Sequence, residues 1–273
     1  MLLVQVSCLF HSVFKFIMRV TLLGTGTSMG VPIIGCACPV CISADVRDKR
    51  LRTAALVETD GLTIAIDCGP DFRQQMLQHR VQHLDAVLFT HAHRDHTGGL
   101  DDVRAYNLWQ QKPMPVYATQ RVQQILKNHY DYVFVEDNKY AGAPNVELHT
   151  ILNHPFTVNN RVTVTPIEAL HGNDPVLGFR IHDFTYLTDA SHVNSREEEK
   201  ISGSKVLVLN ALRQKKHWSH FNLPQALELI NRLQIPKAYL THISHQMGLH
   251  HEVESNLLPP HVRLAYDGLQ ITL

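Results

Sequence analysis

The sequence HAHRDH, residues 91–96, follows the run DAVLFT and places three histidines and an aspartate within six positions. Side chains alternate along an extended segment, so His91 and His93 project from the same side, whereas Asp95 and His96 lie further along a loop. Imidazole suits zinc, iron or manganese, and a carboxylate adds a hard oxygen ligand. The hexapeptide therefore predicts two adjacent metal positions at the end of a buried strand.

One hexapeptide cannot complete two coordination shells, so further ligands are expected at the ends of later strands. Three candidates follow apolar, strand-like runs: His171 in IEALHGND, Asp189 in FTYLTDASH and His242 in AYLTHISH. A carboxylate can give one oxygen to each cation of a two-metal site. Asp189 is therefore expected to bridge the two ions.

The cysteines form a second candidate metal site. Cys36, Cys38 and Cys41 make a CxCxxC motif, in a chain that has five cysteines in total. An odd number with this close spacing favours a metal clip in a reducing compartment over a disulfide framework. The clip would place three thiolates around one structural zinc and leave one ligand to come from elsewhere. We accordingly predict a cytoplasmic protein.

The pattern of apolar residues predicts a mixed α/β protein with two sheets. Helices are expected over 119–133 and 223–234, the second with Asn222 as its cap and Pro224 in its first turn. The polar segment 135–149 is interpreted as an excursion between two halves. Strands are expected over 19–23, 54–59, 62–66, 85–90, 161–167, 178–181, 205–210, 237–242 and 262–266.

The first 17 residues, MLLVQVSCLFHSVFKFI, are apolar but lack the basic region and the cleavage site of a signal peptide. We interpret Met18 as the natural start. Residues 1–17 are then a non-native or disordered extension, and residues 18–273 form a single domain. No other run is apolar and long enough to cross a bilayer.

The charge balance of the sequence limits the classes of partner that the protein is expected to bind. Lys and Arg together number 25, as do Asp and Glu, so no overall positive field attracts nucleic acid or an anionic membrane. The expected partner is a small-molecule substrate and not a membrane or a nucleic acid, and a homodimer remains open.

Four motifs, THAHRDHTGGLDD, LHGND, YLTDAS and LTHISHQ, occur in an order that resembles the metallo-β-lactamase superfamily. The resemblance implies a four-layer αββα sandwich from about Met18 to the C-terminus. Within the superfamily the chain is most similar to the phosphoribosyl 1,2-cyclic phosphate phosphodiesterase family. The opening GTGTSMGVPIIGCACPVC and the turn at Asp267 and Gly268 also match that family.

The resemblance assigns roles to the candidate residues. Asp67 would orient a metal-binding histidine, although a turn aspartate is an equally good interpretation. His220 would lie over the substrate phosphate, with His217 as a rival. Gly24, Gly26 and Gly30 are interpreted as a tight turn near the metals and not as a nucleotide loop. The implied ligands are His91, His93 and His171 for the first metal, Asp95, His96 and His242 for the second, Asp189 for both, and His245 beside Cys36, Cys38 and Cys41 for the structural zinc.

These assignments predict a dinuclear metal-dependent phosphodiesterase that hydrolyses a small cyclic phosphate ester with a metal-bridging hydroxide. The substrate would be phosphoribosyl 1,2-cyclic phosphate or a 2′,3′-cyclic nucleotide, and the catalytic ions manganese or zinc, with iron as a further option. Asp95, Asp189 and His220 are the predicted catalytic residues. The alternatives are a tRNA 3′-processing endonuclease and a carrier resembling the pyrroloquinoline quinone biosynthesis protein.

Overall fold

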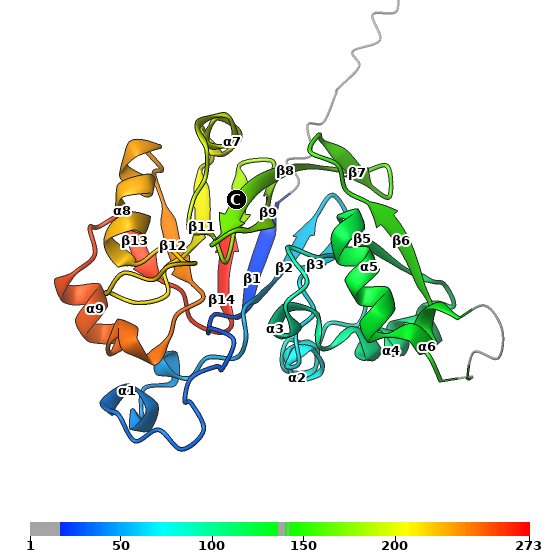
Figure 1. The fold of residues 1–273 in the computed structure, drawn as a ribbon, viewed down its shortest axis with the longest axis horizontal. Coiled ribbons are helices and arrows are strands. Elements are labelled where there is room, and N and C mark those ends of the chain that lie inside the picture. The colour runs from blue at the N-terminus through cyan, green and yellow to red at the C-terminus, as the bar shows by residue number, and fades with distance from the viewer. Residues whose placement is uncertain (1–16, 136–139, 141) are drawn as a thin grey trace, which may run out of the picture.

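Two seven-stranded sheets form the centre of the computed structural model, which describes residues 17–135, 140 and 142–273 (Figure 1). The first sheet contains, in spatial order, β14 (Leu269–Thr272), β1 (Arg19–Gly24), β2 (Ala54–Thr59), β3 (Leu62–Ile66), β4 (Ala86–Leu88), β5 (Met114–Ala118) and β6 (Val146–Thr150). The second contains β13 (Val262–Leu264), β12 (Ala238–Thr241), β11 (Val206–Asn210), β10 (Phe184–Leu187), β9 (Asp174–Ile181), β8 (Val162–His171) and β7 (Phe156–Val158).

Each sheet is antiparallel in one half and parallel in the other. The strands from β3 to β6 pair in parallel, as do those from β10 to β13. Parallel neighbours end at the same edge of their sheet, so the loops that follow them gather at one place. Both sheets thereby collect loops that can carry functional side chains.

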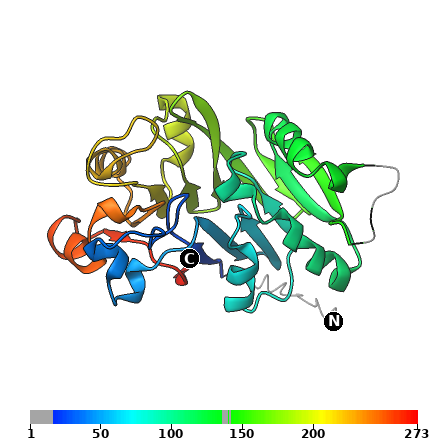
Figure 2. The same ribbon diagram turned by 60° about the horizontal axis from the view of Figure 1, so that its bottom comes forward.

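Helices lie outside the two sheets (Figures 1 and 2). They are α1 (Pro39–Ile42), α2 (Phe72–Gln78), α3 (Arg94–Thr97), α4 (Arg104–Gln110), α5 (Gln120–His129), α6 (Asp131–Phe134), α7 (Ser195–Ile201), α8 (Leu223–Arg232) and α9 (His250–Asn256). Among the described residues, no helix has the length and apolar character needed to cross a membrane.

Three apolar layers hold the elements together. The central layer lies between the sheets and contains Val20, Ile64 and Phe179. A second packs α8 against the strands of the second sheet, and a third packs α2 and α5 against those of the first, with Phe72 and Leu126 fully buried. This αββα arrangement confirms the predicted fold.

Local sequence accounts for most element boundaries. The strands β2 and β3 have the predicted limits, and α8 begins after Asn222, whose side chain forms a capping box with Gln225. The predicted helix 119–133 is instead divided into α5 and α6, because Tyr130 leaves the helical conformation at φ −128° and ψ 45°. Burial of Tyr130 against the first sheet outweighs the local helical pattern.

Two predictions concern the parts of the chain with the least periodicity. The prediction that residues 135–149 form a polar excursion is partly wrong. The strand β6 begins at Val146 and pairs with β5, and Val146 and Leu148 pack against the core. The predicted N-terminal extension lies, up to residue 16, outside the described residues. It stays a prediction, as does the single domain over 18–273.

Candidate metal centre

Three of the predicted site residues follow buried strands and have left-handed backbone conformations. Asp67 after β3 has φ 66°, Asp189 after β10 has φ 59°, and His242 after β12 has φ 54°. Such angles are rare for residues other than glycine and are commonest at functional sites. Each conformation turns the chain sharply at the strand end, and the side chains of Asp189 and His242 meet at the end of the second sheet.

The structure brings together the residues that were predicted for the second metal position. The ligand atoms of Asp95, His96 and His242 all lie within 4.8 Å of one another. Asp189 joins them, since its Oδ2 is 3.3 Å from His96 Nε2 and its Oδ1 is 3.2 Å from His242 Nε2. One carboxylate thus faces two histidines with different oxygens.

The predicted first position is less closely assembled. The rings of His91 and His93 have centroids 4.6 Å apart, and that of His171 is 5.1 Å from His93. His91 shares a tight group of ligand atoms with His96 and Asp189, whereas His93 belongs to none of the tight groups found among the described residues. His93 is also exposed. It must therefore move further than the other candidates to bind an ion.

Buried histidine nitrogens without hydrogen-bond partners indicate whether the cluster can bind divalent ions. His91 Nε2 and His96 Nε2 are buried and have no hydrogen-bond partner among the described residues. A buried polar atom without a partner costs about 1–3 kcal/mol. Since His171 Nδ1 is 2.7 Å from the carbonyl oxygen of Ser219 and donates to it, its Nε2 is left with a lone pair. The donor set fits two divalent cations.

The electrostatics of the cluster support the same conclusion. Burial lowers the pKa of His91 well below its ordinary value and that of His242 to about 4, which keeps both rings neutral. Neutral imidazole is the form that binds metals. Although burial alone would raise the pKa of Asp189, the neighbouring His242 and His96 hold it well below its usual range. The carboxylate is therefore available as an anionic ligand.

Asp67 contacts one of the candidate ligands, as the orienting role implied by the resemblance requires. Its Oδ2 accepts a hydrogen bond from His96 Nδ1 at 2.7 Å, and its carboxylate also accepts from the backbone nitrogen and the hydroxyl of Thr90. This arrangement directs His96 Nε2 toward the cluster. Sequence reasoning missed Thr90, and also Gly69, where a Cβ atom would lie 2.0 Å from the carbonyl oxygen of Asp95.

His220 lies within the cluster. Its Nε2 is 3.1 Å from Asp189 Oδ1, and its ring centroid is 4.4 Å from that of His171. The two Nδ1 atoms of His220 and His217 are 3.2 Å apart, with His217 nearer to the surface. Of the two predicted rivals, His220 is the one in contact with the candidate metal ligands.

The glycine-rich opening positions His242. Gly26 forms β-bridges with both Arg52 and Ile243, and the backbone nitrogen of Thr27 donates to the carbonyl oxygen of Ile243. The segment is thus held against the residue that follows His242.

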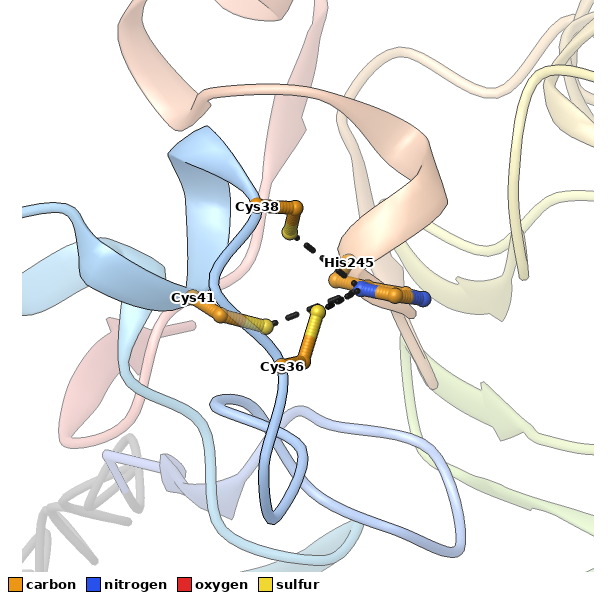
Figure 3. A group of neighbouring side chains, drawn as sticks. All are labelled: Cys36, Cys38, Cys41 and His245. Atoms are coloured by element: carbon orange, nitrogen blue, oxygen red, sulfur yellow. Dashed lines mark hydrogen bonds between the residues drawn. The ribbon is translucent and has the colours of Figure 1, made fainter.

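The cysteine motif meets His245 at one point (Figure 3). His245 Nδ1 is 3.4 Å from Cys36 Sγ, 3.3 Å from Cys38 Sγ and 3.6 Å from Cys41 Sγ. Tetrahedral zinc with its usual bond lengths of about 2.3 Å to sulfur and 2.1 Å to nitrogen would separate these atoms by about 3.6 Å. The four residues therefore fit one zinc ion, which would join the loop around α1 to the chain three residues beyond His242.

A pocket of about 330 Å³ opens beside His91 and His93. It lies between α5 and the β8–β9 hairpin, with apolar walls that include Val122 and Leu177, and Arg121 is among its lining residues. Two of the predicted metal ligands, His91 and His93, are thus accessible to a small molecule.

A cluster of histidines and carboxylates at the strand ends of two sheets, with a pocket beside it, is typical of metal-dependent αββα hydrolases. The chain belongs to the β-lactamase superfamily, because the model of the beta-lactamase superfamily domain matches residues 63–243. A crystal structure of a diphosphatase from the PhnP family is 36% identical, with a TM-score of 0.88 over 94% of this chain and 97% of that one.

Two further similarities limit what can be inferred about this chain from known proteins. An octanoyltransferase from Porphyromonas gingivalis is 44% identical over 256 residues, which cover 93% of this chain and 51% of the relative, so the chain spans about half of that protein. Zinc-bound PqqB from Methylobacterium extorquens is 20% identical, with a TM-score of 0.75 over 93% of this chain and all of that one. This second likeness concerns the fold alone.

Proposed function

We propose that this protein is a dinuclear metal-dependent phosphodiesterase that hydrolyses a small cyclic phosphate ester. The observation that carries the proposal is the position of Asp189 between the two predicted ligand sets. Its carboxylate lies in tight groups with His91 and with His171, which are predicted for the first metal. It also contacts His96 and His242, which are predicted for the second. A carboxylate in this position can be shared by two ions. The diphosphatase relative supports hydrolysis at phosphorus for the same fold.

The proposed ligands are the seven residues predicted from the sequence, and His245 with the three cysteines would hold a structural zinc. When bound, the two catalytic ions would supply positive charge for the phosphate oxygens and a water of lowered pKa. Asp67 would keep His96 in the orientation that the ligand set needs. His220 Nε2, which faces Asp189, would donate a proton to the departing sugar oxygen.

The two alternatives are less well supported. A tRNA endonuclease needs an extended basic arm, but the segment 135–149 contains one lysine against three acidic residues. A carrier does not need a complete set of ligands, whereas every predicted ligand position in this chain holds a metal-binding residue type. The name of the octanoyltransferase applies to a protein of about twice this length. A site made of histidines and carboxylates gives no support for acyl transfer by the present chain.

Asp189→Asn provides the sharpest test, because asparagine tolerates the left-handed backbone at this position. The variant and the wild type, each with measured metal content, would be given ribosyl 1,2-cyclic phosphate, 2′,3′-cyclic nucleotides, a linear aryl phosphodiester and pre-tRNA, with manganese or zinc. Asp183→Asn, in an exposed turn of the same sheet, is the matched control.

We expect the wild type and Asp183→Asn to hydrolyse a cyclic ester, and Asp189→Asn to lose at least a hundredfold in kcat. Wild-type protein that contains both catalytic ions and hydrolyses none of the phosphodiesters would refute the proposal. Cleavage of pre-tRNA alone would favour the endonuclease.

A further inference from the structure

Trp218 is a large aromatic side chain that is 74% exposed beside the candidate metal centre. It directly precedes Ser219 and His220, and the carbonyl oxygen of Ser219 accepts the hydrogen bond from His171 Nδ1. The indole therefore lies one residue away from a group that orients a candidate metal ligand, and two residues away from His220.

The position of this indole is determined by close packing. Gly172, the residue after His171, has φ 63°, and a Cβ atom built there would lie 2.1 Å from Cζ3 of Trp218 and 2.8 Å from Cε3. A glycine at this position thus permits the ring to lie against the backbone of the β8–β9 hairpin. The rest of the ring faces solvent at the edge of the site.

The segment that carries Trp218 is braced by side-chain hydrogen bonds. Arg213 donates to the carbonyl oxygens of Lys215 and Lys216, and also to Gln246 Oε1 at 2.7 Å. Gln214 Nε2 donates to the carbonyl oxygen of Met247. A rigid loop that presents an exposed ring loses little conformational entropy when a ligand stacks on it.

The charge of this loop indicates what kind of ligand it would take. Lys215 and Lys216 are exposed immediately before the aromatic pair His217 and Trp218. Basic side chains next to an exposed aromatic ring are the combination with which proteins bind single nucleotides, since the phosphate is attracted by the cations and the base stacks on the ring.

We propose that Trp218 is the stacking platform for the nucleobase of a nucleotide-type phosphodiester whose phosphate occupies the metal centre. This inference rests on the proposed phosphodiesterase function and selects one substrate class within it. Base-bearing cyclic nucleotides are then preferred over sugar cyclic phosphates that lack a base. Trp218 contributes to specificity, and the hydrolysis itself remains with the metal centre.

The kinetic test compares 2′,3′-cyclic AMP with its abasic counterpart, methyl ribofuranoside 2,3-cyclic phosphate, using the metal-loaded protein. For Trp218→Ala we expect kcat/KM for the nucleotide to fall about tenfold, with little change for the abasic ester, and Trp218→Phe to retain most of the preference. Trp109→Ala is the matched control, because Trp109 is 78% exposed on α4 and lines a different pocket.

A binding measurement gives an independent readout. The chain contains two tryptophans, so Trp109→Phe leaves Trp218 as the single indole. In its metal-loaded form, this variant should show rapid quenching of its fluorescence on mixing with 2′,3′-cyclic AMP but not with the abasic ester.

The outcomes separate the two proposals. If the wild type hydrolyses both esters and Trp218→Ala reduces both rates equally, the stacking platform is refuted while the phosphodiesterase function stands. If the metal-loaded wild type hydrolyses neither ester nor any other phosphodiester, the proposed function is refuted first. Fluorescence that does not change with 2′,3′-cyclic AMP also contradicts the proposal that Trp218 is a stacking platform.

Discussion

His96 donates a hydrogen bond of 2.7 Å from Nδ1 to Asp67, and both side chains are completely buried. The bond joins the loop after β3 to the short helix α3, which follows β4, and leaves His96 Nε2 directed at Asp95 and Asp189. A buried carboxylate that holds a histidine in one tautomer strengthens the metal-binding nitrogen on the far side of the ring.

Asp67→Asn should lower the affinity for the catalytic metals and the activity by 10- to 100-fold, because the amide no longer carries the charge that stabilises the oriented imidazole. Chelator competition and kcat would measure the two effects. The matched control is Asp60→Asn. Asp60 also has a positive φ, and it forms a hydrogen bond of the same length, 2.7 Å, with His182 at the surface. Equal losses in both variants would contradict the orienting role.

Cys41→Ala should remove one zinc ion per chain and lower the melting temperature, because the thiolate is the most deeply buried member of the four-residue clip. Metal analysis and thermal unfolding would measure this change. Cys68→Ala is the control, since Cys68 is fully buried but lies outside the clip. A Cys41→Ala protein with the full zinc content would disprove the predicted clip.

Asn222→Ala and Asn194→Ala should each cost about 1 kcal/mol in the free energy of unfolding, because each removes the side-chain cap of a helix. Their effects on activity should differ. Asn222 Nδ2 also donates to the carbonyl oxygen of Gln214 in the loop that carries His220, so its loss should reduce kcat about tenfold. Urea unfolding and steady-state kinetics would measure both effects. Equal activities of the two variants would show that the loop does not need this bond.

The stability of the protein should depend on pH through Asp267. Burial raises the pKa of Asp267 to about 6, from an ordinary value of 3.8. Because the folded chain binds this proton more tightly than the unfolded chain, the stabilisation is complete below about pH 4 and is lost as the pH rises through 6. The difference corresponds to roughly 3 kcal/mol.

Asp267→Asn cannot titrate and isolates this effect from the other carboxylates. The free energy of unfolding of the wild type, minus that of Asp267→Asn, should decrease between pH 4 and pH 6 and remain level above that range. Chemical unfolding at several pH values would measure this difference. A difference that is constant with pH would mean that Asp267 titrates normally.

The sequence predicted the sheets better than the contacts between them. Residues 54–59 and 62–66 form strands with the predicted limits because apolar, β-branched runs and turn residues are local signals. The strand β5 at Met114–Ala118 and the edge strand β6 were missed, since proline and half-exposed positions blur their alternation. Their pairing comes from neighbours that are distant in sequence.

The same distinction applies to the candidate site. The spacing of His91, Asp95 and His96 is a local pattern and could be found directly. The role of Asp67 could not be separated from that of a turn aspartate, because its partner lies 29 residues away and meets it only when β3 and β4 pair. The outward position of His93 depends on the conformation of its loop, about which spacing alone gives no information.

The left-handed backbone at Asp67, Asp189 and His242 has a consequence for the life of the protein in a cell. Each such conformation costs roughly 1 kcal/mol or more, and the cluster also contains buried nitrogens without partners. Ligands that bind only the folded chain raise its stability by mass action. Metal supply would then govern the abundance of this protein as well as its turnover rate, since a metal-starved chain unfolds more often and is degraded sooner.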